Sequence, residues 1–399
     1  MKSLNRTPTA ILFTTVMFDL IGFGMVIPLI SVYGRHYGAT GISLAILGGI
    51  YSLMQFFSAP FWGMLSDRFG RRPIILMALC GSTISYLIFG LAENYWWLLA
   101  SRAFGGVFAA NIVTAQAFIA DSTKPEERAA GMGLIGAAFG IGFTIGPAFG
   151  GSASHYFGIS APGILAAIVC GCNFLLALRS LPESLPVEQR KKDFRYQHPF
   201  LRKDIRQILA SRPQLRCLIS AFFMVTLAFS NMEQTFSLLF QGKFHLTTEK
   251  AGFYAGMILL VAGLIGVLIQ GKLICGLVRD YGEARLLLTG LAVQAFTMVI
   301  FPFPHLFLAY IPVAVVLAIG SSLVTPTLNG LISRAATAEE QGLVLGFNQG
   351  LGSLARALGP FLGLLAFEIS SALPYFIAAT VYLTLLVFLS SSFKESTPA

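Results

Sequence analysis

Twelve long apolar stretches, separated by short polar segments, make up most of this chain. A helix needs about 20 apolar residues to cross a hydrocarbon core of roughly 30 Å, and each stretch is close to that length. The pattern therefore predicts an all-α membrane protein with twelve transmembrane helices. The predicted spans are residues 9–33, 42–63, 73–92, 95–119, 129–153, 160–180, 214–241, 249–271, 284–302, 306–330, 341–367 and 372–391.

The composition agrees with this pattern. Of the 399 residues, 55% are hydrophobic and only 11% are charged, whereas a soluble domain carries roughly 25% charged residues. The missing charge indicates missing water-facing surface. The apolar run from Thr9 to Tyr33 is too long for the apolar core of a signal peptide, so a retained first helix is expected.

The basic residues are distributed unevenly between the two sides of the predicted bundle. Of the 27 Lys and Arg residues, about 22 fall on the termini and on the loops that follow even-numbered spans. About three, Arg35, Lys243 and Lys250, fall on the opposite side. This asymmetry predicts a multi-pass protein of the inner (plasma) membrane with both termini in the cytoplasm. It also explains the net charge of +9, so no nucleic-acid partner is expected.

A long polar segment divides the spans into two sets of six. We expect an N-terminal six-helix bundle at 1–181, a cytoplasmic linker at 182–212 and a C-terminal six-helix bundle at 213–399. Gly146-Pro147 recurs as Gly359-Pro360, an offset of 213 residues. Two pseudo-symmetric bundles in the same orientation are a known transporter architecture, with the substrate site near the midplane between them.

Charged residues inside spans are the strongest indication of function. Asp19 in span 1 and Glu233 in span 7 are 214 residues apart and occupy equivalent places in the two halves. Inserting each charge at mid-helix costs roughly 2.5–3.5 kcal/mol on insertion scales. Charged residues that are retained despite this cost typically have a function. We expect proton coupling by Asp19 and Glu233. Arg102, in the string Arg-Ala-Phe-Gly-Gly at residues 102–106, resembles the Arg of the span-4 motif of the major facilitator superfamily, and the resemblance implies a part in proton transfer. For Asp19 an interhelical hydrogen bond is an equal alternative, and Gln234 beside Glu233 favours a wet cavity there.

Further polar side chains inside the spans are candidates for substrate binding, and interhelical hydrogen bonding is the alternative for each of them. Phe and Met side chains would supply an apolar wall suited to varied hydrophobic ligands. The candidates are Gln55, Asn111, Gln234, Gln294, Asn348 and Arg356.

The loop after span 2 reads Gly-Met-Leu-Ser-Asp-Arg-Phe-Gly-Arg-Arg over residues 63–72. Its acid can accept charge-assisted hydrogen bonds from a neighbouring Arg, forming a latch that must break when this side opens. The string resembles the loop signature of the major facilitator superfamily. The expected gating residues are Asp67, Arg68, Arg71, Asp121 and Arg128.

Span 5 is rich in glycine. Gly136/Gly140 and Gly142/Gly146 are pairs of small residues four apart, which allow helices to touch backbone to backbone, and Pro147 kinks the span. A dinucleotide loop is excluded because no strand precedes the glycines. The string resembles the antiporter motif of the same superfamily.

Nearly the whole chain resembles the tetracycline-resistance branch of the drug:proton antiporters. The resemblance rests on the strings at 19–28 and 51–60, and on Asp121 followed by Glu127-Arg128-Ala129. It implies the major facilitator fold, alternating access and export of a small amphipathic compound against proton entry. The expected partners are the substrate, protons and the lipid bilayer; no cofactor is expected, and the expected state is a monomer.

The chain departs from that branch at the intramembrane acids of spans 3 and 9, which are replaced by Ser85 and Gln294. Tetracycline itself is therefore not the expected substrate. The alternative on the same fold is an exporter or importer of a physiological metabolite, sugar or siderophore.

An enzyme or a sensor is not expected. The chain has five His residues, all predicted outside the spans or at their ends, and none has the spacing of a metal ligand set. Cys170 and Cys172 form a lone Cys-x-Cys without a nearby His or second pair, so ordinary buried cysteines are favoured over a metal site.

Overall fold

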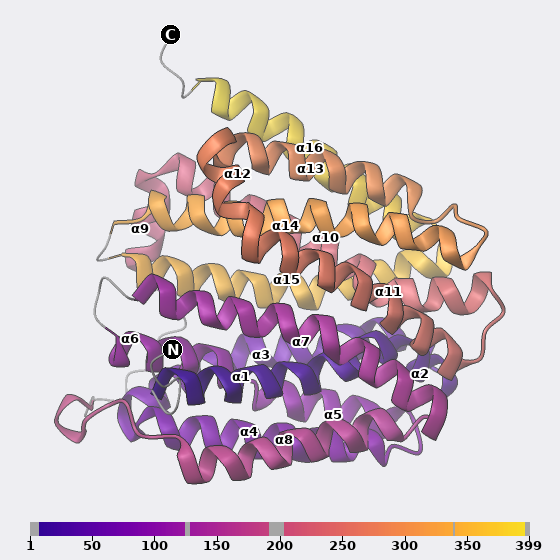
Figure 1. Cartoon of the computed structure of the whole chain (residues 1–399), viewed down its shortest axis with the longest axis horizontal. Helices are drawn as coiled ribbons and strands as arrows, with labels where there is room; N and C mark the ends of the chain where they lie inside the picture. The colour runs from indigo at the N-terminus through magenta and orange to yellow at the C-terminus, as the bar shows by residue number, and fades with distance from the viewer. Residues whose placement is uncertain (1–7, 124–127, 191–202, 338–339, 396–399) are drawn as a thin grey trace. The chain divides into compact units, whose positions relative to one another are not determined.

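The computed structural model describes residues 8–123, 128–190, 203–337 and 340–395, and these ranges are helical apart from the connecting turns (Figure 1). The elements are α1 Pro8–Val26, η1 Ile27–Leu29, α2 Ile30–His36, α3 Gly41–Phe69, α4 Arg71–Gly90, α5 Tyr95–Val107, α6 Asn111–Ser122, α7 Arg128–Phe157, α8 Ala161–Ser180, η2 Val187–Gln189, α9 Lys203–Ser211, α10 Pro213–Lys243, α11 Thr248–Leu268, η4 Ile269–Leu273, α12 Ile274–Tyr281, α13 Glu283–Ile300, η5 Phe307–Ala309, α14 Tyr310–Ala335, α15 Gln341–Ile369 and α16 Leu373–Glu395.

Twelve helical segments, some of them composed of two or three of these elements, are long and apolar enough to cross a membrane, which confirms the predicted number of spans. The predicted end of span 8 at residue 271 was wrong, because the helix continues to Tyr281 through the π-helix η4. Lys272 and Arg279 end the apolar run without ending the helix, since long basic side chains can extend from a helix toward water.

Span 4 was predicted as one helix, but α5 and α6 are separated by a turn at residues 108–110. Two side chains of α3 cause this break. Ser58 Oγ donates to the carbonyl oxygen of Gly106 at 3.1 Å, and Trp62 Nε1 donates to that of Val107 at 2.5 Å. These carbonyls are then occupied, and side chains inserted into the backbone hydrogen-bond ladder interrupt a helix.

The chain forms two compact units that are interleaved in sequence. The first comprises residues 1–39, 50–198 and 246–257, and the second comprises 40–49, 199–245 and 258–399. The core of the first unit joins α1, α4, α6 and α7 through buried side chains such as Leu12, Leu79, Phe118 and Ala138.

In the first unit, α1 packs directly along α7 (Figure 1). A Cβ atom on Gly24 would lie 2.6 Å from the carbonyl oxygen of Gly142, and one on Gly146 would lie 2.7 Å from that of Ile21. Real Cβ atoms do not approach oxygen so closely, so the two backbones touch because glycine stands at these positions.

The second unit repeats this contact between α10 and α15. A Cβ atom on Gly359 would lie 2.6 Å from the carbonyl oxygen of Leu227, and one on Gly363 would clash with the side chain of Asn231. Gly359 is the sequence repeat of Gly146. The two six-helix bundles therefore share a glycine-mediated contact between their first and fifth spans.

Candidate functional site

A sharp turn between α3 and α4 brings the first cluster of charges together. Gly70 occupies this turn with φ +107°, a backbone conformation that side-chain-bearing residues rarely adopt. Its N–H closes the end of α3 by donating to the carbonyl oxygen of Ser66 at 3.0 Å. The next residue, Arg71, begins α4, so its guanidinium projects at the junction of two helices.

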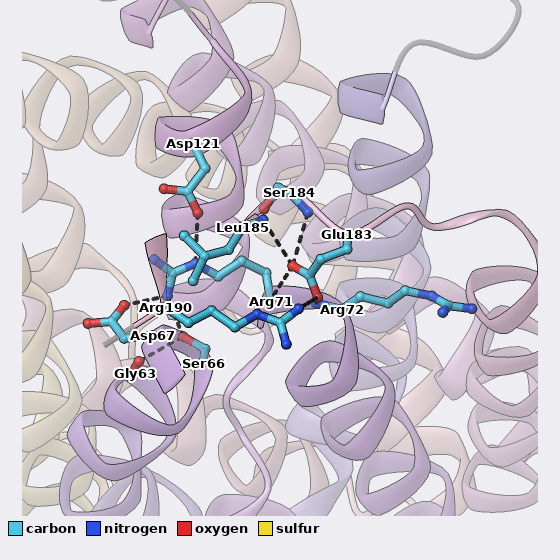
Figure 2. A network of polar contacts seen from close by, with 10 residues as sticks. All are labelled: Gly63, Ser66, Asp67, Arg71, Arg72, Asp121, Glu183, Ser184, Leu185 and Arg190. Carbon is cyan, nitrogen blue, oxygen red and sulfur yellow. Dashed lines mark hydrogen bonds and ion pairs between the residues drawn. The ribbon is translucent and has the colours of Figure 1, made fainter. Parts of the chain in front are cut away.

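Arg71 is the centre of a polar network that Figure 2 shows from close by. Its Nη1 donates to Asp67 Oδ1 at 2.5 Å and to Ser66 Oγ at 2.7 Å, and its Nε donates to Asp121 Oδ2 at 2.8 Å. The side chain of Arg71 is 8% exposed, against 27% for Asp67 and 22% for Asp121. One nearly buried cation thus joins the ends of α3, α4 and α6.

Glu183 completes this network from the segment that follows α8. Its carboxylate accepts from the backbone N–H groups of Arg71 at 2.8 Å and Arg72 at 3.3 Å, at the start of α4. It also accepts from its neighbours Ser184 and Leu185, both at 3.0 Å (Figure 2). A carboxylate at a helix N-terminus satisfies unpaired N–H groups and the positive end of the helix dipole.

We call Ser66, Asp67, Arg71, Asp121 and Glu183 the Arg71 cluster. Of the expected gating residues, it contains three. Arg68 lies outside it, exposed and with its guanidinium 5.5 Å from the ring of Phe69. Arg128 begins α7, but its side chain lies outside the described residues.

Inside the first unit, Asp19 on α1 faces Asn111 of α6 and Ser82 of α4. Asn111 and Ser82 lie within reach of its carboxylate as hydrogen-bond donors, but its buried Oδ1 atom and the amide atoms of Asn111 make no hydrogen bond of normal geometry within the described residues. Buried polar atoms are nearly always paired in native proteins. This group therefore has unused hydrogen-bonding capacity at the expected coupling residue and at one expected substrate residue.

Arg102 on α5 is 1% exposed. Its guanidinium lies over the rings of Phe89 at 4.9 Å and Tyr86 at 5.4 Å, and its Nη2 donates to Ser85 Oγ at 3.3 Å. Aromatic faces stabilise a cation, more strongly when water is excluded. Its Nη1 has no hydrogen-bond partner within the described part of the chain. Tyr86 is thus one of the two aromatic rings that face the guanidinium of Arg102.

In the second unit, Glu233 on α10 interacts electrostatically with Arg356 on α15. Nη2 of Arg356 donates to Ser353 Oγ on the same helix at 3.2 Å. The acid of the second unit therefore has a cation in its surroundings, whereas the acid of the first unit has neutral amide and hydroxyl groups. The equivalent sequence positions of Asp19 and Glu233 hold acids in different environments.

The remaining substrate-binding candidates are distributed over both units. Gln55 on α3 is half-buried, and Gln234 on α10 is buried beside Glu233. Gln294 on α13 and Asn348 on α15 are 2% and 1% exposed, and the side-chain oxygen of each has no hydrogen-bond partner among the described residues. These oxygens can accept hydrogen bonds from water or from a ligand.

Sequence reasoning missed Glu183, Ser66 and the neutral surroundings of Arg102. Glu183 lies 112 residues from the N–H group that it caps, and no local pattern marks such a pair. Ser66 stood inside the recognised loop string and was not singled out. In the part of the chain that the structure describes, no three His, Cys, Asp or Glu side chains are grouped to hold a metal ion.

Comparison with known proteins places this geometry in a family. The profile of the Major Facilitator Superfamily matches residues 12–360 and again 269–399. The chain is 30% identical to the tetracycline resistance protein, class C, of Escherichia coli over 97% of this chain and 96% of that protein. It is 31% identical to multidrug resistance protein 2 of Bacillus subtilis (strain 168), over 95% and 94% of the two chains.

The fold has solved counterparts. The crystal structure of the human organic anion transporter MFSD10 superposes with a TM-score of 0.72 at 24% identity, covering 96% of this chain and 98% of that one. An inward-facing bacterial homologue of the lysosomal transporter Spinster gives 0.73 at 15% identity, covering 96% and 94%. The chain is a multi-pass membrane transporter that belongs to the Major Facilitator Superfamily.

Proposed function

We propose that this transporter exports small amphipathic compounds in exchange for protons, by alternating access between its two six-helix repeats. The observation that carries the proposal is the pair of acids inside membrane spans, Asp19 and Glu233, at equivalent positions of the repeats. Retaining both against a cost of roughly 2.5–3.5 kcal/mol each favours a role in the transport cycle.

The first acid is suited to exchanging a proton. Oδ1 of Asp19 makes no hydrogen bond of normal geometry within the described residues, so that atom can accept a proton, and Asn111 and Ser82 lie within reach as donors to the ionised carboxylate. Arg102, whose guanidinium lies over the rings of Phe89 and Tyr86, is proposed as the positive charge that tunes this exchange. In the proposed cycle, Asp19 takes up and releases the proton, and Arg102 is a buried positive charge of the same unit.

The second acid is suited to linking the proton to the substrate. Arg356 neutralises Glu233 while that acid is ionised. Protonation of Glu233 releases Arg356, and the buried oxygens of Gln294 and Asn348 remain open to the compound that is carried. Asn111, next to Asp19, and Gln55 on α3 have the corresponding role in the first unit.

The Arg71 cluster is proposed as the gate on the side of the basic loops. The excess of Lys and Arg on these loops supports a cytoplasmic location for them and for both termini, in the inner (plasma) membrane. The cluster holds three helix ends together through one cation, and its ion pairs must rearrange when those ends separate.

Transport by purified protein in proteoliposomes tests the proposal. We expect efflux of a panel of amphipathic dyes and drugs to follow an imposed proton gradient and to fall to the level of empty liposomes when an ionophore removes the gradient. Transport of each compound should also move protons across the membrane in the opposite direction, and a pH dye trapped inside the liposomes measures this movement. If the compound instead moves in the same direction as the protons, at a rate that increases with the gradient, the proposed exchange of substrate for protons is wrong.

A further inference from the structure

Two buried arginines of the first unit differ in how their charge is balanced. Arg71 donates to the carboxylates of Asp67 and Asp121. Arg102 lies in the span formed by α5 and α6 and is 1% exposed. Among the residues that the structure describes, no carboxylate lies within ion-pairing distance of Arg102. Its positive charge is therefore buried without a negative partner from this part of the chain.

The hydroxyl groups around Arg102 do not supply the missing charge. A guanidinium stays ionised in proteins, so it cannot lose a proton to relieve its burial. Ser85 Oγ accepts from Nη2 at 3.3 Å, and Ser101 Oγ accepts from Nε at 3.4 Å. Each hydroxyl gives its own hydrogen to a backbone carbonyl oxygen, Ser85 to that of Ser101 and Ser101 to that of Leu98, both at 2.7 Å. The two hydroxyls thus orient the guanidinium but carry no net charge.

The aromatic groups around the guanidinium do not carry a charge either. Its carbon Cζ lies 4.9 Å from the ring centre of Phe89 and 5.4 Å from that of Tyr86. Cation–π attraction stabilises a buried cation only in part, because removing a full charge from water costs more. The ionisable groups that interact electrostatically with Arg102 are the hydroxyls of Tyr86 and Tyr51, and tyrosine is uncharged at neutral pH. A negative charge is therefore still required.

The second unit balances a charge of this kind within the chain. Arg356 on α15 is half-buried and interacts electrostatically with the carboxylate of Glu233. The first unit has an intramembrane acid as well, Asp19, but the groups within reach of that carboxylate are neutral amide and hydroxyl groups of α6 and α4. Charges inside a membrane protein are almost always paired. The counter-charge of Arg102 is therefore expected to come from outside the chain.

The surroundings of Arg102 are tightly packed. A Cβ atom on Gly105 would lie 2.5 Å from Ser85 Oγ, and one on Gly106 would lie 2.3 Å from the carbonyl oxygen of Tyr51. The backbone of α5 therefore lies directly against α4 and α3, as small residues allow. An anion that binds here must be small, of the size of a chloride ion, because this packing leaves little space for a large organic acid.

Nη1 of Arg102 is the atom at which such an anion can bind. It carries two N–H donors, is buried and has no hydrogen-bond partner within the described ranges. We propose that Arg102 forms a binding site for one chloride ion, which accepts hydrogen bonds from Nη1 and balances the guanidinium inside the membrane. Hydrogen bonds between two charged groups are stronger than neutral ones. The site is occupied in the resting protein, so it does not depend on the proposed exchange for protons.

Supplying an acid from the protein itself provides the first test. Ser85 Oγ lies 3.3 Å from Nη2 of Arg102, so the carboxylate of Ser85→Asp can reach the guanidinium and take the place of chloride. Ser85→Asn, which has the same size and no charge, is the matched control. In detergent at constant ionic strength, replacing gluconate by chloride should raise the thermal midpoint of wild type and Ser85→Asn by at least about 2 °C. The midpoint of Ser85→Asp should not change. An equal response of Ser85→Asp and Ser85→Asn would overturn the proposal.

Bromide can show directly where the anion binds, because its anomalous X-ray scattering distinguishes it from water. In crystals grown with bromide in place of chloride, we expect an anomalous peak at hydrogen-bond distance from Nη1 of Arg102. The peak should be present in wild type and in Ser85→Asn, and absent in Ser85→Asp. Wild-type crystals without a peak at Arg102 would refute the site.

A larger anion distinguishes a chloride site from a site for a carried compound. Benzoate and benzamide have nearly the same size and differ in charge, and both are larger than chloride. We expect neither of them to change the thermal midpoint of wild type in gluconate. Stabilisation by benzoate that is lost in Ser85→Asp, with no effect of chloride, would assign Arg102 to an anionic substrate and overturn the chloride site. These measurements use resting protein, so their outcome is separate from that of the transport assay.

Discussion

Nε of Arg71 donates a 2.8 Å hydrogen bond to Oδ2 of Asp121, and this contact joins the first residue of α4 to the last turn of α6. The same guanidinium reaches Asp67 at the end of α3 through Nη1. A single side chain thus contacts the ends of three helices. The carboxylates are partly exposed, so they remain accessible to water when the contact breaks.

Neutralising one acid of the cluster should weaken it measurably. Asp121→Asn keeps an acceptor but removes the charge, and we expect the free energy of unfolding to fall by about 1 kcal/mol, at the low end for charged hydrogen bonds because Asp121 is partly solvated. The transport rate should fall several-fold because the gate loses one of its anions.

Glu188→Gln is the matched control, since this acid is exposed and lies in the same part of the chain as Glu183. Thermal unfolding in detergent and initial transport rates check both variants. Equal behaviour of Asp121→Asn and Glu188→Gln would show that the Arg71–Asp121 contact has no role beyond surface charge.

Glu183→Gln should destabilise α4 at its N-terminus. The variant keeps one acceptor oxygen but loses the negative charge that opposes the positive end of the helix, an effect of about 0.5–1 kcal/mol. Hydrogen exchange of the first-turn amides of α4, including Arg72, should accelerate by about the corresponding factor of two to five. Unchanged exchange in that turn would refute the capping role.

Two glycines of α7 should respond in opposite ways to the same substitution. Gly146→Ala places a Cβ atom 2.7 Å from the carbonyl oxygen of Ile21 and should force α1 and α7 apart, with a loss of stability of about 1–3 kcal/mol. Gly136→Ala meets no atom within 4 Å and should be neutral or stabilising by up to about 1 kcal/mol, because alanine favours helix. Similar thermal midpoints for both variants would contradict the backbone contact.

Glu340 gives the chain a pH-dependent contact outside the spans. Hydrogen bonds from Thr337, followed by the charge of Arg212, hold the pKa of Glu340 below its ordinary value. The unfolded state then binds more protons between the folded pKa and the ordinary pKa of about 4.3, so stability rises with pH there. The stability difference between wild type and Glu340→Gln should be complete above about pH 5 and shrink as the pH falls further. A difference that grows on acidification would reverse the sign.

The sequence was sufficient for features that repeat along one helix. Apolar length predicted the twelve spans, and the glycine spacing of Gly142 and Gly146 predicted a close helix contact that the structure contains. The string at 63–72 predicted that Asp67 would accept from a neighbouring Arg, which is Arg71. These features depend on neighbours within one or two turns, so they are visible without a fold.

Contacts between distant segments could not be predicted in this way. The break at 108–110 depends on donors from Ser58 and Trp62, about 50 residues earlier in the chain. The cap by Glu183 depends on how α8 returns toward α4.

The most direct test of proton-coupled export compares two modes of transport by the same variants in proteoliposomes. Asp19→Asn and Glu233→Gln should each lose gradient-driven efflux by on the order of tenfold or more, because a permanently neutral side chain cannot release a proton. Both should retain substrate exchange at equal pH on the two sides, which needs no net proton movement. Normal gradient-driven efflux by both variants would contradict the assignment of proton coupling to these intramembrane acids.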